Sequence, residues 1–221
     1  MIKTENLSKT YGKGEGAVTA LKNASLEIRD GELVAIIGKS GSGKTTLLNL
    51  LGCLDTATDG KAFCNDVEIT SMDDSSAADF RLRHIGFVFQ FFDLLPELTA
   101  AENILLPARL AKKSAENYKE IVDGLGISDR VDHYPSQLSG GQQRAAIARA
   151  MINDPEMLLC DEPTGNLDER SGKEVMDLLL KMNHERKKTV LIVTHNPEIA
   201  AQCGRIIEIS DGEIVRQSID K

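Results

Sequence analysis

The sequence predicts an α/β protein with a mostly parallel sheet and a helical insertion. Apolar segments of strand length alternate with helical patterns up to residue 90 and again after residue 152, which is typical of a parallel sheet covered by helices. The pattern between residues 91 and 152 is helical throughout. Of the 221 residues, 41% are hydrophobic and 27% are charged, so the chain can bury a large core.

The first part of the chain is rich in strand signals. Extended segments are expected at residues 2–7 and 24–28, followed by a turn and an unbroken apolar run at residues 33–37. Such a run is typical of a strand that is buried on both faces. Glycines follow it, and four leucines between residues 47 and 51 then predict a buried helix.

A further strand is expected at residues 85–89, ahead of the helical insertion. Within the insertion, Thr99 and Glu102 have the spacing of a capping box, in which each side chain bonds to the backbone of the other residue at the start of a helix. Ser139 and Gln142 have the same spacing ahead of a second helix.

Strands and helices alternate again after the insertion. Strands are expected at residues 157–160 and 189–194, and between them a helix over residues 171–183, which Ser171 and Glu174 would begin as a third capping box.

The end of the sequence predicts a short helix and a hairpin. Asn196 and Pro197 are typical of a cap and a first helical turn, respectively. Residues 205–210 and 213–216 flank the turn Asp211-Gly212, which is a β-hairpin signal.

Charge argues against two classes of partner. The chain has 26 basic and 34 acidic residues, a net charge of −8, which makes it a poor binder of nucleic acid backbones. Anionic lipid would also repel it, so any membrane attachment is expected to run through a protein. The longest apolar runs have about five residues, whereas a membrane-spanning helix needs about 20, so no direct insertion is expected.

The N-terminus and the cysteines suggest a cytosolic protein. The first residues lack the apolar core of a secretion signal. The four cysteines show no CxxC pairing, and Cys160 lies in an apolar run as a buried small residue would. A reduced compartment is therefore expected.

A glycine-rich loop follows the apolar run at residues 33–37 and matches the pattern G-x-x-x-x-G-K-[ST]. Its residues are Gly38, Lys39, Ser40, Gly41, Ser42, Gly43, Lys44 and Thr45, with Thr46 next. Glycines let backbone N–H groups point at phosphate oxygens, and the following helix adds positive potential. Lys44 would neutralise the outer phosphates and the Thr45 hydroxyl would ligate Mg²⁺. The alternative is a Gly/Ser-rich turn with a surface lysine.

Two carboxylates, Asp161 and Glu162, end the predicted strand at residues 157–160. Two consecutive acids at the end of a buried strand have no structural role, whereas an Mg²⁺–nucleotide site has a role for each carboxylate. Asp161 would hold the water shell of the metal, and Glu162 would take a proton from the attacking water. The alternative is a helix-capping aspartate beside a solvated glutamate.

A third motif resembles the signature of the ATP-binding cassette (ABC) ATPases. Its residues are Leu138, Ser139, Gly140, Gly141 and Gln142. Other positions resemble that family in the family's order: Tyr11 the aromatic that stacks on adenine, Gln90 the Q-loop glutamine, residues 163–168 the loop that crosses the dimer interface, and His195 the switch histidine. Taken without the other motifs, Tyr11 could simply pack on the surface, and His195 could be a hydrogen-bonded core residue or a helix cap.

The resemblance covers essentially the whole chain and implies one ABC ATPase domain over residues 1–221. Residues 1–90 and 153–221 would form a P-loop NTPase (RecA-like) core with an N-terminal antiparallel β-subdomain, and residues 91–152 a helical subdomain with the signature. It also implies a head-to-tail homodimer in which each of two ATP molecules lies between the phosphate loop of one subunit and the signature of the other.

The resemblance assigns further roles. Catalysis would use Glu162, His195, Gln90 and Lys44, and Mg²⁺ would be held by Thr45, Gln90 and, through water, Asp161. Asp168 would lie at the dimer interface, and Ser139 and Gly141 would contact the γ-phosphate, although Ser139 could simply cap its own helix. The family usually has one more residue between the signature and the arginine-containing helix that follows, so either the helix start absorbs the difference or the signature contacts are weaker.

The stretches at residues 50–63, 85–110 and 161–168 resemble the branch of lipoprotein-releasing, macrolide-exporting and peptide-resistance transporters. That branch implies a separate permease with a large extracytoplasmic domain, a place on the cytoplasmic face of the plasma (inner) membrane, and export or extraction of a lipophilic or peptide-like substrate. The alternative is a cell-division ATPase that transmits force without transporting solute.

An apolar group after Gln90 has two interpretations. It comprises Phe91, Phe92, Leu94 and Leu95. These side chains would belong either to the core of the insertion or to an exposed patch that receives a permease helix.

Overall fold

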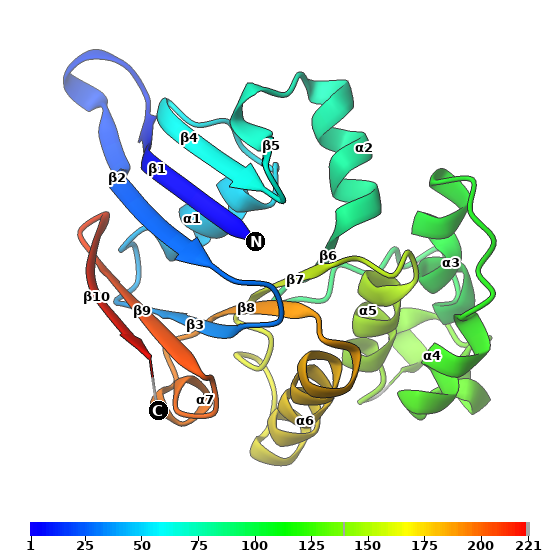
Figure 1. Cartoon of the computed structure of the whole chain (residues 1–221). Coiled ribbons are helices and arrows are strands. Elements are labelled where there is room, and N and C mark those ends of the chain that lie inside the picture. The colour runs from blue at the N-terminus through cyan, green and yellow to red at the C-terminus, as the bar shows by residue number, and fades with distance from the viewer. Residues whose placement is uncertain (139, 220–221) are drawn as a thin grey trace.

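The chain folds into two sheets with helices around them (Figure 1). The structure is a computed structural model that describes residues 1–138 and 140–219. Within these residues, an antiparallel sheet has the order β2-β1-β4-β5 and a larger sheet has the order β10-β9-β3-β8-β7-β6. The first contains β1 (Ile2–Tyr11), β2 (Val18–Ile28), β4 (Asp59–Cys64) and β5 (Val67–Glu68). The second contains β3 (Leu33–Ile37), β6 (Ile85–Val88), β7 (Met157–Asp161), β8 (Thr189–Val193), β9 (Arg205–Ser210) and β10 (Glu213–Ile219).

The larger sheet is parallel except at one edge, as the sequence predicts. Strand β10 pairs antiparallel with β9, and every other neighbouring pair in this sheet is parallel. The β9–β10 turn has positive φ at Asp211 (50°) and Gly212 (84°), which confirms the expected hairpin.

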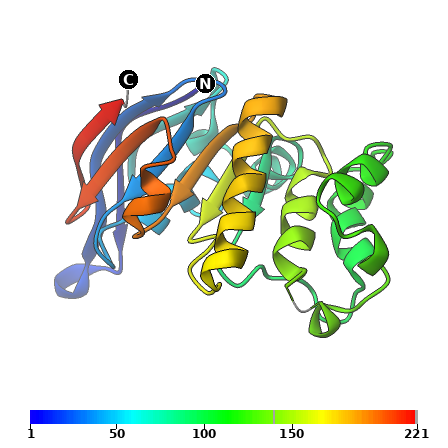
Figure 2. The same cartoon turned by 90° about the horizontal axis from the view of Figure 1, so that it is seen from below.

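Helices lie on both faces of the larger sheet and beyond its β6 edge (Figures 1 and 2). Beside the core strands are α1 (Lys44–Leu51), α2 (Asp74–His84), α6 (Glu169–Arg186) and α7 (Pro197–Ala200). Between β6 and β7 the chain forms α3 (Ala100–Leu110), α4 (Tyr118–Gly124) and α5 (Gln142–Met151). Short 3₁₀ turns occur at Gly14–Gly16, Ile69–Ser71, Ser128–Arg130 and Pro135–Gln137.

Side chains of the central strands alternate between two hydrophobic clusters. In β8, Val190 and Ile192 belong to the cluster that contains α6 and α7, whereas Leu191 and Val193 belong to the cluster that contains α1 and the antiparallel sheet. These four side chains are at most 1% exposed. Both faces of the sheet are therefore buried, which explains the unbroken apolar runs of its strands.

The helical segment shares a core with one face of this sheet. Ile104 of α3 and Ile147 of α5 lie in the same cluster as Val88 of β6 and Leu158 of β7. Packing therefore joins the signature-bearing segment directly to the strands.

One predicted capping box is confirmed and two are wrong. Thr99 and Glu102 bond reciprocally at the start of α3. Helix α5 begins at Gln142 with Gly141 at its N-cap, so Gln142 lies too early to close the second box, and it donates instead to the carbonyl of Pro135 (2.8 Å). Ser139 lies outside the described residues.

The third box is displaced because a stronger cap precedes it. Helix α6 begins at Glu169, and the carboxylate of Asp168 accepts from the N–H of Ser171 (3.0 Å). Ser171 is therefore inside the first turn. Glu174 bonds to Arg144 rather than to Ser171.

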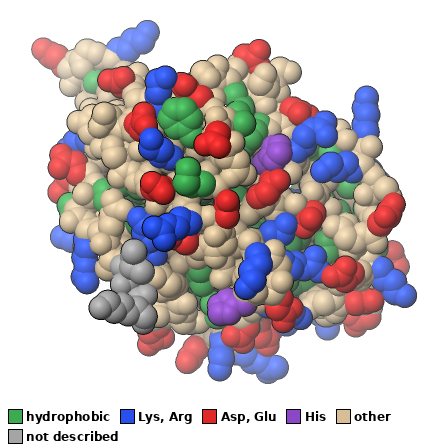
Figure 3. Space-filling view, in the orientation of Figure 1, with side chains coloured by type: hydrophobic (Ala, Val, Ile, Leu, Met, Phe, Trp, Pro, Cys, Tyr) green, Lys and Arg blue, Asp and Glu red, His purple; other side chains and the backbone are tan. Residues whose placement is uncertain are grey.

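The sequence did not predict α2, β4 or β5, or the first half of β2. Helix α2 buries none of its residues, so it has no apolar stripe to recognise. No helix in the described part of the chain is long and apolar enough to cross a membrane. On the face in Figure 3, acidic and basic side chains are interspersed, with small groups of hydrophobic side chains between them.

Candidate functional site

Four neighbouring parallel strands bring the predicted site residues to one edge of the sheet. The order β3-β8-β7-β6 places the carboxyl ends of these strands side by side. The phosphate loop follows β3, His195 lies two residues beyond β8, Asp161 ends β7, and Gln90 lies two residues beyond β6. Topology alone therefore gathers residues that are far apart in the sequence.

The phosphate loop is wedged between two strands, and two of its glycines are required there. Gly38 and Gly43 have φ of +153° and +106°. A Cβ on Gly38 would lie 2.1 Å from the carbonyl oxygen of Ile209, and one on Gly43 would lie 2.3 Å from that of Ala20. Any side chain at either position would displace backbone, so the tight wrap of the loop depends on glycine.

Two buried polar groups in the loop fit a phosphate. Lys44 is 8% exposed, and its Nζ donates to the carbonyl oxygens of Gly38 and Lys39 (2.9 Å each). The Ser42 hydroxyl is buried without a hydrogen-bond partner among the described residues. Leaving a buried hydroxyl unpaired is unfavourable, and a phosphate oxygen would satisfy it beside the Lys44 charge. Lys39, Ser40 and Gly41 are exposed, and Thr46 is half-buried.

Thr45 and Asp161 supply oxygen ligands of the kind that Mg²⁺ prefers. The Thr45 Oγ1 donates to the Asp161 carboxylate (3.3 Å), and burial raises the pKa of Asp161 above its ordinary value. Among the described residues, no cluster of three or more His, Cys, Asp or Glu side chains could hold a metal alone. Mg²⁺ normally takes only one or two protein carboxylates and completes its shell with water and phosphate, so the pair fits it.

Glu162 and His195 form a hydrogen-bonded pair. His195 Nδ1 lies 2.9 Å from Glu162 Oε1, with the glutamate side chain 16% exposed and the histidine 70% exposed. Glu162 has φ of +46°, the left-handed region, and its N–H donates to the carbonyl of Val193 (2.9 Å). A non-glycine residue in that region is strained, and such strain clusters at functional sites.

Gln90 lies against the loop at residues 163–168. A Cβ on Gly165 would be 3.2 Å from Gln90 Nε2, and Asn166 Nδ2 donates to the backbone carbonyl of Gln90 (3.4 Å). Among the described residues, no hydrogen bond joins Gln90 to Thr45 or Asp161. The structure thus links the Q-loop position to the Asp168 loop rather than to the predicted metal ligands.

Tyr11 is held by two residues that sequence reasoning missed. Its hydroxyl donates to Asp55 (2.7 Å), and Lys9 Nζ lies 4.9 Å from the ring centroid. Lys9 also pairs with Asp55 (2.5 Å). Burial, and then the bond to Asp55, raise the pKa of Tyr11. The i,i+2 spacing of Lys9 and Tyr11 in a strand was the available signal, because it puts both on one face.

The signature segment is separate from the phosphate loop within one chain. Leu138 is buried, whereas a Cβ on Gly140 would meet nothing within 4 Å. Gly140 and Gly141 line a polar cavity of about 630 Å³ that Asp168 and Ser171 also line, and no phosphate-loop residue does so.

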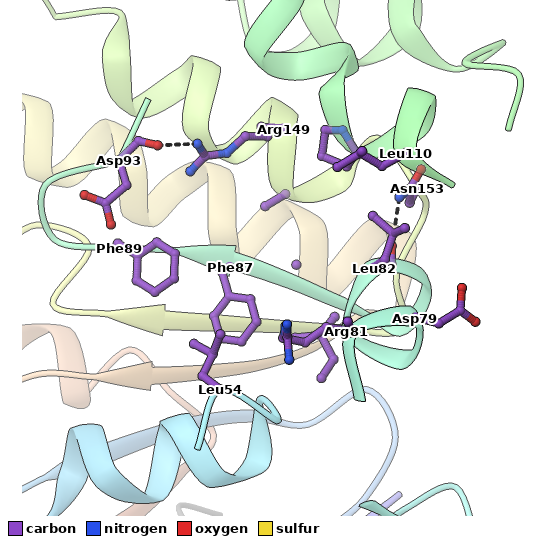
Figure 4. Close-up of a pocket in the computed structure, with 15 residues that line it drawn as sticks. Leu54, Asp79, Arg81, Leu82, Phe87, Phe89, Asp93, Leu110, Arg149 and Asn153 are labelled. Atoms are coloured by element: carbon purple, nitrogen blue, oxygen red, sulfur yellow. Dashed lines mark hydrogen bonds between the residues drawn. The ribbon is translucent and has the colours of Figure 1, made fainter. Parts of the chain in front are cut away.

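A second, largely apolar groove of about 640 Å³ lies between α2, β6, α3 and α5 (Figure 4). Leu54, Phe87 and Leu110 line it, together with Arg149, whose guanidinium donates to the carbonyls of Phe92 and Asp93.

The apolar group after Gln90 divides between the two interpretations. Phe91 is 73% and Leu95 44% exposed, whereas Phe92 is buried and Leu94 packs on the core.

Known proteins match the chain over nearly its full length. A family model described as "ABC transporter" matches residues 21–165. The macrolide export ATP-binding/permease protein MacB of Salmonella choleraesuis is 51% identical over 95% of this chain, and the chain spans 33% of that protein. An uncharacterized ABC transporter ATP-binding protein of Methanocaldococcus jannaschii, MJ0796, is 46% identical over 98% of this chain and 96% of its own length.

Solved structures agree with the sequence matches. The dimeric structure of a post-hydrolysis state of the ATP-binding cassette MJ0796, bound to ADP and Pi, superposes with a TM-score of 0.90 at 43% identity, over 99% of this chain and 98% of that chain. The cbiO1 subunit from Clostridium perfringens, part of the cbiONQ ABC transporter complex, gives 0.86 at 27% identity, over 99% and 88% of the two chains.

Proposed function

The chain belongs to the ABC transporter family, as its sequence motifs and its α/β P-loop fold led us to expect, and on that premise we propose that its ATPase activity drives a separate membrane permease. The observation that supports the ATPase activity most directly is the convergence of Lys44, Asp161 and Glu162 at one sheet edge, beside the buried Ser42 hydroxyl, which has no hydrogen-bond partner in the described part of the chain.

Binding would begin at the phosphate loop. Residues 38–46 would surround the phosphates, Lys44 would neutralise their charge, and adenine would stack on the face of Tyr11 that Lys9 leaves free. Mg²⁺ held by Thr45 and Gln90, and by Asp161 through water, would neutralise charge that develops on the phosphates.

Hydrolysis would use the pair at the ends of β7 and β8. The Glu162 carboxylate would accept a proton from the attacking water, and His195 would orient that carboxylate and hydrogen-bond the γ-phosphate. The strained backbone of Glu162, pinned by Val193, keeps the carboxylate at one place, so little reorganisation is needed during the reaction.

A homodimer would complete each site. In the head-to-tail arrangement, residues 138–142 of one subunit would cover the ATP on the other, with Asp168 at the interface. The open space beside Gly140 supports this, because a partner could approach its backbone closely. Residues 91–152 would then act as the signature subdomain of a single domain that spans residues 1–221.

The groove between α2 and α3 would receive a helix of the permease. Its apolar lining and the exposed Leu110 in that lining are suited to an amphipathic helix. The partner would carry a large extracytoplasmic domain and hold the chain on the cytoplasmic face of the inner membrane. By analogy with the macrolide exporter, the cargo would be a lipophilic or peptide-like compound, exported or extracted from the membrane.

The test is to identify what the ATP-trapped protein binds. Tagged Glu162→Gln protein would be trapped with ATP in its native cells, solubilised in mild detergent and purified with its partners. A permease with few membrane helices and a large outer domain is the expected result. A division-site membrane protein would instead support force transmission without transport, and the absence of any membrane protein would overturn both.

A further inference from the structure

The guanidinium of Arg144 connects α4 and α5, two helices of the signature segment, with α6 of the core. Arg144, in the first turn of α5, bonds through Nη2 to Glu174 Oε2 of α6 (2.7 Å). Its Nη1 donates to the carbonyl oxygen of Leu125 at the C-cap of α4 (2.6 Å). Helices α5 and α6 lie side by side in both views of the molecule (Figures 1 and 2).

Both oxygens of the Glu174 carboxylate have partners. Arg170 Nε lies 3.3 Å from the second oxygen, one helical turn away on α6. The hydrogen bond from Arg144 lowers the pKa of Glu174, so the carboxylate is charged at neutral pH. The Glu174 side chain is 41% exposed, and pairs with that much solvent contact contribute little to global stability.

The pair lies between two loops that are both expected at the dimer interface, the signature loop over the partner's ATP and the Asp168 loop at the subunit contact. Arg144 follows Gln142, the last signature residue, by two positions, and Glu174 follows Asp168 by six. Arg144 and Glu174 line the 630 Å³ polar cavity together with Gly140, Gly141 and Asp168.

The start of α5 needs an anchor from outside the helix. Gly141 is its N-cap and provides no side-chain bond, and Gly140 has φ of +69°. The N–H of Gly141 donates to the carbonyl of Leu138 (3.0 Å), a bond within the loop itself. Two successive glycines have wide conformational freedom, so side-chain bonds from the start of α5 to neighbouring elements help to fix the loop relative to the core. The bond from Gln142 to Pro135 stays within the helical segment, whereas the bond from Arg144 to Glu174 reaches the core.

We propose that the Arg144–Glu174 pair is a positioning link that holds the signature loop (residues 138–142) in register with the Asp168 loop (residues 163–168). The inference rests on the proposed function, because only a head-to-tail dimer brings both loops against the partner subunit. The link pre-orders two halves of one binding surface, so dimer formation need not order them separately.

Loss of the link should weaken dimerisation without weakening ATP binding by the monomer. In the Glu162→Gln background, Glu174→Ala should raise the protein concentration for half-maximal ATP-driven dimerisation by about tenfold, measured by analytical ultracentrifugation. Affinity for a fluorescent ATP analogue at low protein concentration should stay within about twofold, because the phosphate loop alone binds there. Glu174→Gln keeps the shape of the side chain and an acceptor oxygen. Its concentration for half-maximal dimerisation should therefore lie between that of the Glu162→Gln parent and that of Glu174→Ala.

The matched control is Asp177→Ala. Asp177 is exposed on the same helix and makes no ion pair or hydrogen bond with any residue that the structure describes, so this change should leave dimerisation within about twofold. If Glu162→Gln protein does not dimerise with ATP, the proposed function is wrong. If it dimerises and Glu174→Ala leaves dimerisation unchanged, or lowers dimerisation and monomer ATP affinity equally, the link itself is overturned.

Discussion

The imidazole of His195 and the carboxylate of Glu162 are joined by a 2.9 Å hydrogen bond across the ends of β8 and β7. The bond uses one carboxylate oxygen, while the backbone N–H of Glu162 is tied to Val193. Side chain and backbone are thus both fixed on one residue, which is what a general base requires for a defined approach to water.

Glu162→Gln should reduce ATP turnover by about 10²–10⁴-fold, the usual contribution of a general base. The amide keeps the shape of the side chain, so ATP should still bind and the dimer should form and persist. Steady-state hydrolysis and light scattering with ATP would measure both effects. A variant that stays monomeric with saturating ATP would count heavily against the proposed cycle.

His195→Ala should lower kcat by roughly 10–100-fold, the range expected for losing a hydrogen bond to a charged group. The ATP affinity should change little, because the phosphate loop supplies most phosphate contacts. His184→Ala is the control, since His184 is exposed in the last turn of α6. If His195→Ala changed KM and left kcat intact, His195 would be a binding residue.

Tyr11→Ala should weaken binding of an ATP analogue by roughly 5–150-fold, corresponding to about 1–3 kcal/mol for one stacked base. Tyr11→Phe keeps the ring but loses the bond to Asp55, so its effect should be only a few-fold. Equal affinities of the alanine and phenylalanine variants would contradict stacking on this ring.

The pH dependence of stability should change when Asp161 is replaced. Burial raises the pKa of Asp161, so the folded protein retains its proton to higher pH than the unfolded chain does. The free energy of unfolding should therefore fall as pH rises from about 4 through the folded-state pKa. Asp161→Asn removes this loss and, without nucleotide, should raise the melting temperature at pH 7.5.

Differential scanning fluorimetry at pH 5 and pH 7.5 would check this, with a smaller gain expected at pH 5. A melting temperature that falls at pH 7.5 would mean that the Thr45–Asp161 bond outweighs the desolvation of the carboxylate.

Leu110→Asp should abolish copurification of the membrane partner and leave ATP hydrolysis by the isolated protein within about twofold. Leu110 is 64% exposed and lines the groove, so a charge there costs partner binding rather than folding. Val215→Asp is the control, because Val215 is 55% exposed on β10, at the far edge of the sheet. Partner recovery that is equal in both variants would place the docking surface elsewhere.

The gathering of the candidate site residues was predictable where a polar motif follows the end of a strand. Lys44, Asp161 and His195 each follow an apolar run, and parallel strands must bring such positions together. The ion pairs of Lys9 with Asp55 and of Arg144 with Glu174 were not predictable, because they join residues 46 and 30 positions apart and no local pattern marks them. Capping was misjudged at residue 171 because Asp168 competes for the same backbone donors.

The alternation of β7 and β8 between two hydrophobic clusters limits how this chain can change length. Side chains repeat every two residues along a strand, so inserting or deleting one residue within β8 would send Leu191 and Ile192 to the wrong faces. The same change would turn His195 away from Glu162. The same two-residue alternation therefore orients both the core side chains and the site residues. Natural length variation should be confined to the connections between strands.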